Sequence, residues 1–361
     1  MVSATPTKME YRYLGNSGLK VSVFSFGNWL NSNKNENYEI TRDAIKVCFE
    51  NGVNFYDTAE VYGFGEAESQ MGKAFKELGL RREDLVVSTK LFKVSMTGIN
   101  DTFLSRKHIV EGLKNSLKRL DMSYVDVVFC HRPDYDTPLE ETVRAMSYVI
   151  DQGLAFYWGT SEWPADRISK AIELCERLNL HKPIVEQPEY SMLWRSPFEK
   201  NLRRIFGEYK YGSTIWSPLA GGLLTGKYND DVIPEGSRYS VHGNYLNHIW
   251  TKWMSDEKKE STLIKLRALG ELAKELGFTQ AQLALAWAIA NRDVSTCILG
   301  FTRIEQVSEN LKALELYQQW NDDIEKKVRD ILGNDPEVDM DWRRWAPMPL
   351  RRDDALKAQR Q

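Results

Sequence analysis

Short runs of β-branched and aromatic residues recur along the chain, and each is followed by a stretch whose apolar residues repeat with helical spacing. Consecutive runs begin 29 to 40 residues apart, except for a last interval of 82 residues. A strand, a helix and two loops need about thirty residues, so this alternation predicts parallel strands joined by helical crossovers. Eight such strands predict a closed (β/α)8 TIM barrel. The runs begin near Val23, Asn54, Leu85, Val125, Ala155, Ile184, Ser213 and Ser295.

Single segments support this interpretation. The runs "DLVVSTK" and "YVDVVFC" are apolar on both faces, which is typical of strands covered by helices. The segment "SRKHIVEGLKNSLKRL" repeats apolar residues on one face, and Ser105 is its expected N-cap. The segment "TPLEETVRAMSYVIDQG" predicts a helix that starts from Thr137 and stops at Gly153, because glycine suits a left-handed C-cap.

Two features depart from the plain repeat. The segment "YRYLGNSGLKVSVFS" predicts a β-hairpin that turns at Asn16 to Gly18 and plugs one end of the barrel. The long interval between strands seven and eight holds a loop rich in glycine and aromatic residues, from Ala220 to Trp253, followed by two extra helices. An insertion of this length is usually a lid or a binding loop. No linker divides the chain, so we expect one domain over 1–361, with a core over about 11–332 and a loosely ordered tail over 333–361.

Composition and charge exclude several classes of protein. The chain has 361 residues, with 48 basic and 51 acidic side chains, and no basic stripe that would favour nucleic acid or an anionic membrane. Four cysteines are far apart, without zinc-like spacing, and predict reduced thiols and no metal site. No apolar run approaches the ~18 residues that span a bilayer, and the N-terminus lacks the apolar core of a signal peptide. We therefore expect a cytoplasmic protein that does not insert into a membrane.

Polar residues or glycines stand where the apolar strands end. A barrel gathers the carboxyl ends of its strands into one cleft, where barrel enzymes carry out their chemistry. A doubly wound sheet would instead need a G-x-G-x-x-G after its first strand, and "FGNWLNS" does not supply one. The residues at these ends are Gly27 and Asn28, Asp57, Lys90, His131, Ser161, Gln187, Ser217 and Gly300.

Four side chains at this mouth form a candidate catalytic set: Asp57, Tyr62, Lys90 and His131. Singly, each is more often structural, and only their combination favours catalysis. At an effective dielectric near ~20, charges ~4 Å apart attract by about 4 kcal/mol, so Lys90 is expected to lower the pKa of the Tyr62 phenol by as much as about 3. Asp57 would keep Lys90 charged, and His131 would orient a carbonyl oxygen toward Tyr62.

Several motifs resemble the aldo-keto reductases, most closely their voltage-gated potassium channel β-subunit branch. They are "GVNFYDTAEVYG", "STK", "VVFCHRPD", "YWGTSEW", "IWSPLAGGLLTGKY" and "ILGFTRIEQVSENL", and the resemblance runs from about Tyr11 to Leu332. It implies a (β/α)8 barrel that binds NADPH or NADP+ across its mouth without a Rossmann motif. It also implies that Asp57, Tyr62, Lys90 and His131 are the catalytic tetrad.

The resemblance implies a set of cofactor contacts as well. In the family an aromatic residue after strand seven stacks on the nicotinamide, and Trp216 holds that place. Gln187 is suited to the carboxamide, Lys227 and Arg238 to phosphates, and Arg303 to a 2′-phosphate, which favours NADPH over NADH. Without the resemblance, these basic residues fit a solvated loop equally well. The implied contacts are Gly27, Asn28, Trp29, Asp57, Ser161, Gln187, Trp216, Ser217, Pro218, Leu219, Lys227, Arg238, Gly300, Thr302, Arg303, Gln306, Glu309 and Asn310.

Two further patterns are weaker evidence of function. Trp29, Phe92 and Trp163 follow strand ends and are candidates, with Tyr62 and His131, to line an apolar substrate pocket, although such aromatics are as often packing. The segment "GGLLTGKY" contains G-x-x-x-x-G-K, but a tyrosine replaces the Ser or Thr of a P-loop and no helix is expected to open there.

The sequence leaves two functions open. One is an NADPH-dependent reductase of aldehydes and some ketones, with Tyr62 as general acid. The alternative is an NADPH-binding regulatory β-subunit of a voltage-gated potassium channel that acts as a redox sensor, for which the resemblance implies a homo-tetramer. The channel subunits have Asn in place of His131 and Arg in place of Glu162; the first difference favours the enzyme, and the second puts one cofactor contact in question. The short segment before the first strand also favours the enzyme. The sequence does not indicate the physiological carbonyl substrate.

Overall fold

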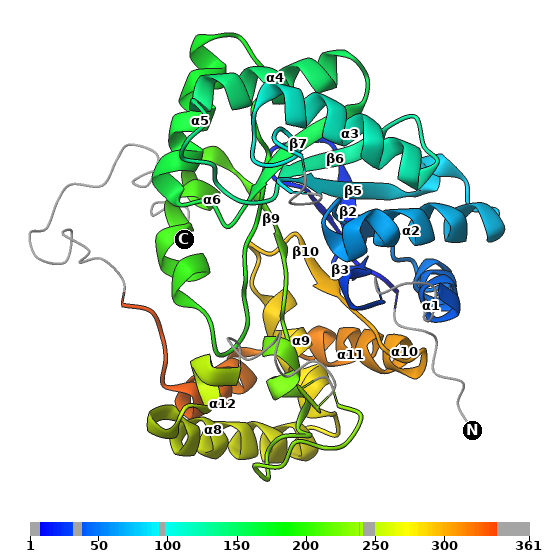
Figure 1. Cartoon of the computed structure of the whole chain (residues 1–361). Coiled ribbons are helices and arrows are strands. Elements are labelled where there is room, and N and C mark those ends of the chain that lie inside the picture. Colours follow the sequence, from blue (N-terminus) through cyan, green and yellow to red (C-terminus); the bar gives the residue numbers. More distant parts are fainter. Residues whose placement is uncertain (1–7, 32–37, 94–97, 238, 241–249, 338–361) are drawn as a thin grey trace, which may run out of the picture.

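Eight parallel strands close a barrel in the computed structural model of the chain, in the order β10-β3-β4-β5-β6-β7-β8-β9 (Figure 1). The predicted barrel is confirmed, and each of its strands begins within one residue of the predicted position. The structure describes residues 8–31, 38–93, 98–237, 239–240 and 250–337. The barrel strands are β3 (Phe24–Gly27), β4 (Phe55–Asp57), β5 (Val86–Leu91), β6 (Val125–Cys130), β7 (Ala155–Ser161), β8 (Val185–Gln187), β9 (Gly212–Ile215) and β10 (Thr296–Leu299).

Helices between the strands cover the outside of the barrel (Figure 1). In α3 the hydroxyl of Ser105 accepts the main-chain N–H of His108, so the predicted N-cap is confirmed. The helix predicted from Thr137 starts later, at Leu139, because the proline before it takes an extended ψ of 127°. The helices are α1 (Tyr38–Glu50), α2 (Glu66–Glu77), α3 (Arg106–Leu120), α4 (Leu139–Asp151), α5 (Ala165–Arg177), α6 (Arg203–Tyr209), α8 (Asp256–Glu275), α9 (Gln280–Ala290), α10 (Glu305–Leu311), α11 (Ala313–Gln318) and α12 (Asp322–Leu332), with short turns η1 (Trp29–Asn31), η2 (Tyr62–Gly65), η3 (Arg82–Asp84), η4 (Pro197–Asn201) and η5 (Ala220–Thr225).

The predicted hairpin precedes the barrel. Strands β1 (Tyr11–Tyr13) and β2 (Lys20–Ser22) pair in antiparallel register. Gly15 in its turn has a φ of +58°, and a Cβ there would lie 2.4 Å from the carbonyl oxygen of Ile184. Because Ile184 immediately precedes β8, the turn sits against the amino-terminal end of the barrel. The hairpin thus closes the end opposite the mouth, and its Leu14 is fully buried among residues of the barrel interior.

The insertion between β9 and β10 contains the two extra helices, α8 and α9, as predicted. Its glycine-rich start forms the short turn η5, and residues 226–237 form turns without a helix, unlike a P-loop. Arg238 lies outside the described residues.

The start of the tail is more firmly held than the sequence suggested. Asp335 pairs with Arg195 and with Arg329, each at 2.5 Å. Asn334 donates an amide hydrogen to the carbonyl oxygen of Met192, at 2.8 Å. The rest of the predicted tail, 338–361, lies outside the described residues.

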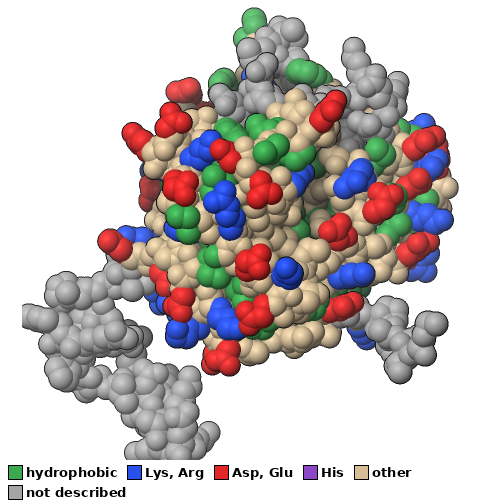
Figure 2. Space-filling model, turned by 90° about the horizontal axis from the view of Figure 1, so that it is seen from below, with side chains coloured by type: hydrophobic (Ala, Val, Ile, Leu, Met, Phe, Trp, Pro, Cys, Tyr) green, Lys and Arg blue, Asp and Glu red, His purple; other side chains and the backbone are tan. Residues whose placement is uncertain are grey.

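The cysteines are as the sequence predicted. On the face drawn in Figure 2, acidic and basic side chains of the described residues alternate. All four cysteines are buried free thiols. Over the described ranges, no helix is both long and apolar enough to cross a membrane, and no group of His, Cys, Asp and Glu could hold a metal ion.

Candidate active site

Three neighbouring strands and one turn position the four predicted catalytic side chains. Asp57 is the last residue of β4, Lys90 lies near the end of β5, and His131 directly follows β6. These strands are adjacent in the barrel, and Tyr62 begins the turn η2 that follows β4. The carboxyl ends of parallel strands meet at one edge, so the four side chains share the barrel mouth.

Lys90 holds the set together. Its Nζ donates to Asp57 Oδ2 at 2.5 Å, to the carbonyl oxygen of Thr58 at 2.8 Å and to the phenol oxygen of Tyr62 at 3.2 Å. An ammonium has three N–H donors, and all three are directed at oxygen. The Lys90 side chain is fully buried. Because the Tyr62 oxygen accepts a hydrogen from Lys90, its own hydrogen stays available to a ligand.

The pKa of Tyr62 does not follow the sequence-based expectation. Burial raises the pKa of this phenol above its ordinary value, and the opposing attraction of Lys90 is smaller. The predicted net lowering is therefore wrong, because removing the phenolate from water costs more than the cation returns. Tyr62 is consequently a protonated phenol at neutral pH, as a proton donor must be.

Lys90 and His131 differ in charge: the first is a cation and the second is neutral. Burial acts to lower the pKa of Lys90, but attraction to Asp57 and Tyr62 outweighs it and the pKa is raised, so the ammonium persists. Burial, assisted by the charges of Lys90 and Arg132, holds the pKa of His131 well below its ordinary value. His131 is therefore a neutral imidazole, and its ring lies edge-on to that of Tyr62 with 5.7 Å between the ring centres.

Two residues fix the carboxylate of Asp57. Ser88 Oγ donates to Asp57 Oδ1 at 2.6 Å, and the amide of Gln187 donates to the same oxygen at 3.2 Å. The main-chain oxygen of Gln187 accepts from Ser161 Oγ at 2.8 Å. Gln187, for which the sequence predicts a contact with a carboxamide, thus orients Asp57 in this structure.

The predicted cofactor residues that the structure describes divide into two groups. One group lies at or just beyond the strand ends of the same mouth, and the other lies farther along the segments that follow β9 and β10, which are adjacent strands. Asn28 in the first group is 1% exposed, and its Oδ1 is buried without a hydrogen-bond partner, as an acceptor reserved for a ligand would be. The first group is Gly27, Asn28, Trp29, Asp57, Ser161, Gln187, Trp216, Ser217, Pro218, Leu219 and Gly300, and the second is Lys227, Thr302, Arg303, Gln306, Glu309 and Asn310.

The second group suits an anionic ligand. The Nζ of Lys227 lies 3.9 Å from the place of a Cβ on Gly222, so the ammonium faces the η5 turn. After β10, the main-chain N–H groups of Thr302 and Arg303 donate to Gln306 Oε1, at 2.9 and 3.3 Å. Gln306 therefore organises the turn that presents Arg303.

Glu162 has a role that the sequence did not indicate. Its Oε1 accepts the indole N–H of Trp216 at 2.9 Å and the main-chain N–H of Glu189 at 2.7 Å. Glu189 in turn pairs with Lys252, at the end of the long loop, at 3.0 Å. Glu162 thus fixes the plane of Trp216, the residue expected to stack on a nicotinamide.

The aromatic residues near the mouth differ in their exposure. Trp29 lies beside Tyr62, with 6.5 Å between the ring centres. Phe92 packs edge-on against Phe103. Phe64, two residues after Tyr62, is 77% exposed. Trp163 is 3% exposed within the hydrophobic core, so its part in a substrate pocket remains only a prediction.

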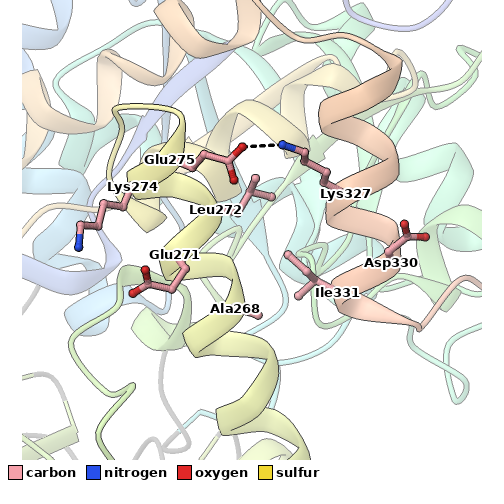
Figure 3. A pocket seen from close by; sticks show the side chains of 8 residues that line it. All are labelled: Ala268, Glu271, Leu272, Lys274, Glu275, Lys327, Asp330 and Ile331. Atoms are coloured by element: carbon pink, nitrogen blue, oxygen red, sulfur yellow. Dashed lines mark hydrogen bonds and ion pairs between the residues drawn. The ribbon is translucent and has the colours of Figure 1, made fainter.

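A groove elsewhere on the molecule does not belong to the site. It lies between α8 and α12, and Figure 3 shows the carboxylate of Glu275 pointing across it to Lys327, at 2.6 Å. Charges of both signs line it beside Leu272 and Ile331. This is a seam between two packed helices, without the convergent polar groups found at the mouth.

Comparison with known proteins agrees with the geometry. The model of the Aldo/keto reductase family matches residues 24–329. The chain is 49% identical over 328 residues to a probable voltage-gated potassium channel subunit beta of Arabidopsis thaliana, covering 91% of this chain and 98% of the relative. A protein of the same description from Oryza sativa subsp. japonica is 48% identical over 328 residues, which cover 91% of this chain and 98% of the relative. A putative voltage-gated potassium channel subunit beta of Schizosaccharomyces pombe is 46% identical, over 95% of this chain and all of the relative.

Proposed function

This chain belongs to the aldo/keto reductase family, and from that membership and the geometry of the barrel mouth we propose that it reduces aldehydes and some ketones with NADPH. One observation carries the proposal. The Lys90 ammonium lies 3.2 Å from the phenol oxygen of Tyr62, beside the neutral imidazole of His131. This arrangement suits proton donation to a carbonyl oxygen.

Each residue of the set has a separate task. Tyr62 donates its phenol hydrogen to the carbonyl oxygen, and Lys90 stabilises the phenolate that remains. His131 carries one N–H as a neutral imidazole and orients the same oxygen. Asp57 keeps Lys90 charged through their 2.5 Å contact. NADPH, when bound, supplies the hydride to the carbonyl carbon.

The residues present fit this cofactor. Trp216, held by Glu162, offers a fixed ring for the nicotinamide, and Asn28 offers a buried acceptor. Lys227 and Arg303 are suited to the phosphates, with Arg303 assigned to the 2′-phosphate. We assign NADPH rather than NADH on this last pairing.

The proposal is tested by following NADPH oxidation against aliphatic, aryl and dicarbonyl substrates. We expect at least one aldehyde to be reduced with a kcat of about 1 per second or more, which is ordinary for enzymes. A titration of cofactor fluorescence should show tighter binding of NADPH than of NADH. Tight NADPH binding without turnover of any carbonyl in the panel would contradict the enzymatic role.

A second function has its own support in the names of the relatives. Their descriptions as potassium channel β-subunits favour a regulatory subunit that senses the redox state of the cofactor. In that role the chain would assemble, as a tetramer, with the cytoplasmic part of a channel. The test is co-purification with the cytoplasmic domain of a voltage-gated potassium channel, in the presence of NADPH or NADP+. A retained complex with negligible carbonyl turnover would favour this function over the first.

The neutral state of His131 predicts the pH dependence of the reaction. Its pKa lies well below the ordinary value near ~6.5, because of burial and then of Lys90 and Arg132, so the imidazole stays neutral as the pH falls toward 6. Burial also raises the pKa of Tyr62, so the phenol stays protonated as the pH rises. We therefore expect a profile of kcat/KM that is flat between about pH 6 and 9.

A comparison of His131→Asn with the wild-type protein checks this prediction. Asparagine keeps a hydrogen-bond donor but does not titrate. A wild-type inflection near ~6.5 that is absent from the variant would show that His131 titrates as a solvated residue.

A further inference from the structure

Arg132 places a second positive charge beside the catalytic set. It follows His131 directly, and its Nη1 donates to the carbonyl oxygen of His131 at 2.5 Å and to Ser161 Oγ at 3.2 Å. These two hydrogen bonds place the guanidinium beside the carboxyl ends of β6 and β7, at the mouth of the barrel. After burial and the Lys90 charge, its positive charge also acts to lower the pKa of His131. The side chain is half-buried.

This guanidinium has no carboxylate partner among the residues that the structure describes, although two carboxylates, Asp134 and Glu162, follow the adjacent strands β6 and β7. Asp134 accepts main-chain N–H groups, including that of Leu104 at 2.9 Å. Glu162 is engaged by Trp216 and Glu189. The guanidinium is only half-buried, so it does not need a partner to be stable. A cation held in place at the mouth without a carboxylate is, however, suited to bind an anion supplied by a ligand.

The phosphates of the proposed cofactor are not this anion. Their expected partners follow β9 and β10, whereas Arg132 follows β6. In the closed order of the barrel, β6 is four strands from β10 in either direction and therefore lies directly across the mouth. The nicotinamide carboxamide offers an acceptor but carries no charge. The remaining source is the carbonyl substrate, which must approach His131 and Tyr62.

We propose that Arg132 binds a carboxylate carried by the substrate, so that the preferred substrates are aldehydes with a carboxylate a few bonds from the carbonyl group. This proposal depends on the carbonyl reduction proposed above. The carbonyl oxygen is bound by Tyr62 and His131, and the carboxylate occupies the neighbouring guanidinium. Because Arg132 is anchored through Nη1, its remaining N–H groups present a fixed donor edge to a planar anion.

The test compares an acid with its methyl ester, namely 4-carboxybenzaldehyde with methyl 4-formylbenzoate. The two share a ring and the position of the substituent, and only the acid is charged. Their difference in intrinsic reactivity cancels when the acid-to-ester ratio of a variant is compared with that of the wild-type protein. We expect Arg132→Leu to lower the acid-to-ester ratio of kcat/KM by roughly 10- to 100-fold, the range of a charge-assisted hydrogen bond. The acid-to-ester ratio of Arg132→Lys should lie between those of the wild-type protein and Arg132→Leu, because lysine keeps the charge and loses the planar fork.

Arg167→Leu is the matched control. Arg167 is a nearby cation on α5 that donates to the carbonyl oxygen of Asp134 and lies over the Trp163 ring. Its removal should change the acid-to-ester ratio by less than about twofold, as expected for a partly screened charge without direct contact. If the acid-to-ester ratio fell equally in Arg167→Leu, the preference for the acid would come from the overall positive charge near the mouth and not from contact with Arg132, and the proposal would be overturned. An unchanged acid-to-ester ratio in Arg132→Leu would also overturn it. This outcome includes a variant in which kcat/KM falls equally for both substrates and a variant in which only the affinity for NADPH is weaker.

Failure of this inference is distinguishable from failure of the reductase function. The wild-type protein should reduce the neutral ester with NADPH in either case. If the ester is reduced and the ratio does not depend on Arg132, the reductase function stands and only the substrate assignment falls.

Discussion

Replacing Tyr62 with phenylalanine is expected to lower kcat/KM for aldehyde reduction by about three orders of magnitude, within the range of general acid catalysis. The substitution removes the phenol hydrogen that the carbonyl oxygen receives, and no other described group takes its place. Lys90 would keep its bonds to Asp57 and to the carbonyl oxygen of Thr58. The charge network therefore survives, and NADPH binding should stay close to that of the wild-type protein.

Steady-state kinetics and fluorescence titration of NADPH check this result together. Tyr56→Phe is the matched control, because Tyr56 is a buried phenol on the same strand as Asp57 that donates to the carbonyl oxygen of Val53 at 2.9 Å. Its loss should cost about 1 kcal/mol of stability and little activity. If Tyr62→Phe retained more than a tenth of the activity, or lost NADPH binding and turnover in parallel, Tyr62 would not be the proton donor.

The environment of Tyr62 serves the two protonation states differently. Burial keeps the phenol protonated before reaction, as its raised pKa indicates. In the proposed reaction the proton moves to the substrate oxygen, and the phenolate that remains would face the Lys90 ammonium, which lies 3.2 Å from the Tyr62 oxygen in this structure. A fixed cation in a water-poor site stabilises the charge that develops without reorganising. In the proposed reaction, Lys90 therefore stabilises the Tyr62 phenolate that proton transfer produces. It does not ionise the phenol before the reaction.

The barrel could be predicted from the sequence because its signal is periodic. Strands such as "DLVVSTK" are apolar on both faces and recur at nearly constant spacing, so position errors stay within one residue. Errors arose where local chemistry decides the end of an element. Pro138 delayed the start of α4. The sequence also carried no sign that Asp335, at the start of the predicted tail, pairs with Arg195 and Arg329.

The meeting of the four candidate side chains at one mouth could be predicted, but the direction of the pKa shift of Tyr62 could not. Asp57, Lys90 and His131 stand at strand ends, and a barrel brings all strand ends to one mouth. The sign of the pKa shift of Tyr62 depends on how completely water is excluded, which no sequence pattern gives. The roles of Glu162 and Arg132 depend on the direction of single side chains, and adjacency in "VVFCHRPD" does not show which way Arg132 points.

Replacing Lys90 with methionine is expected to lower the free energy of unfolding by about 3–5 kcal/mol and to reduce activity at least as much as Tyr62→Phe. Methionine fills a similar volume but leaves Asp57, 3% exposed, as a buried carboxylate without a cation. Ser88 and Gln187 still donate to that carboxylate, but they carry no charge. Urea denaturation measures the stability, and the same assay of NADPH oxidation measures the activity.

A second substitution separates the two effects of Lys90. In Asp57→Asn/Lys90→Met both partners are neutral, so we expect most of the lost stability to return while the activity stays low, because the Tyr62 phenolate still lacks its cation. Lys76→Met is the matched control: Lys76 pairs with Asp121 at 2.7 Å, but its side chain is 76% exposed. Solvent screens a surface pair of this kind, so this variant should unfold almost as the wild-type protein does. A Lys90→Met protein as stable as Lys76→Met would mean that Asp57 is protonated or well hydrated, and the charge network drawn around Tyr62 would then be wrong.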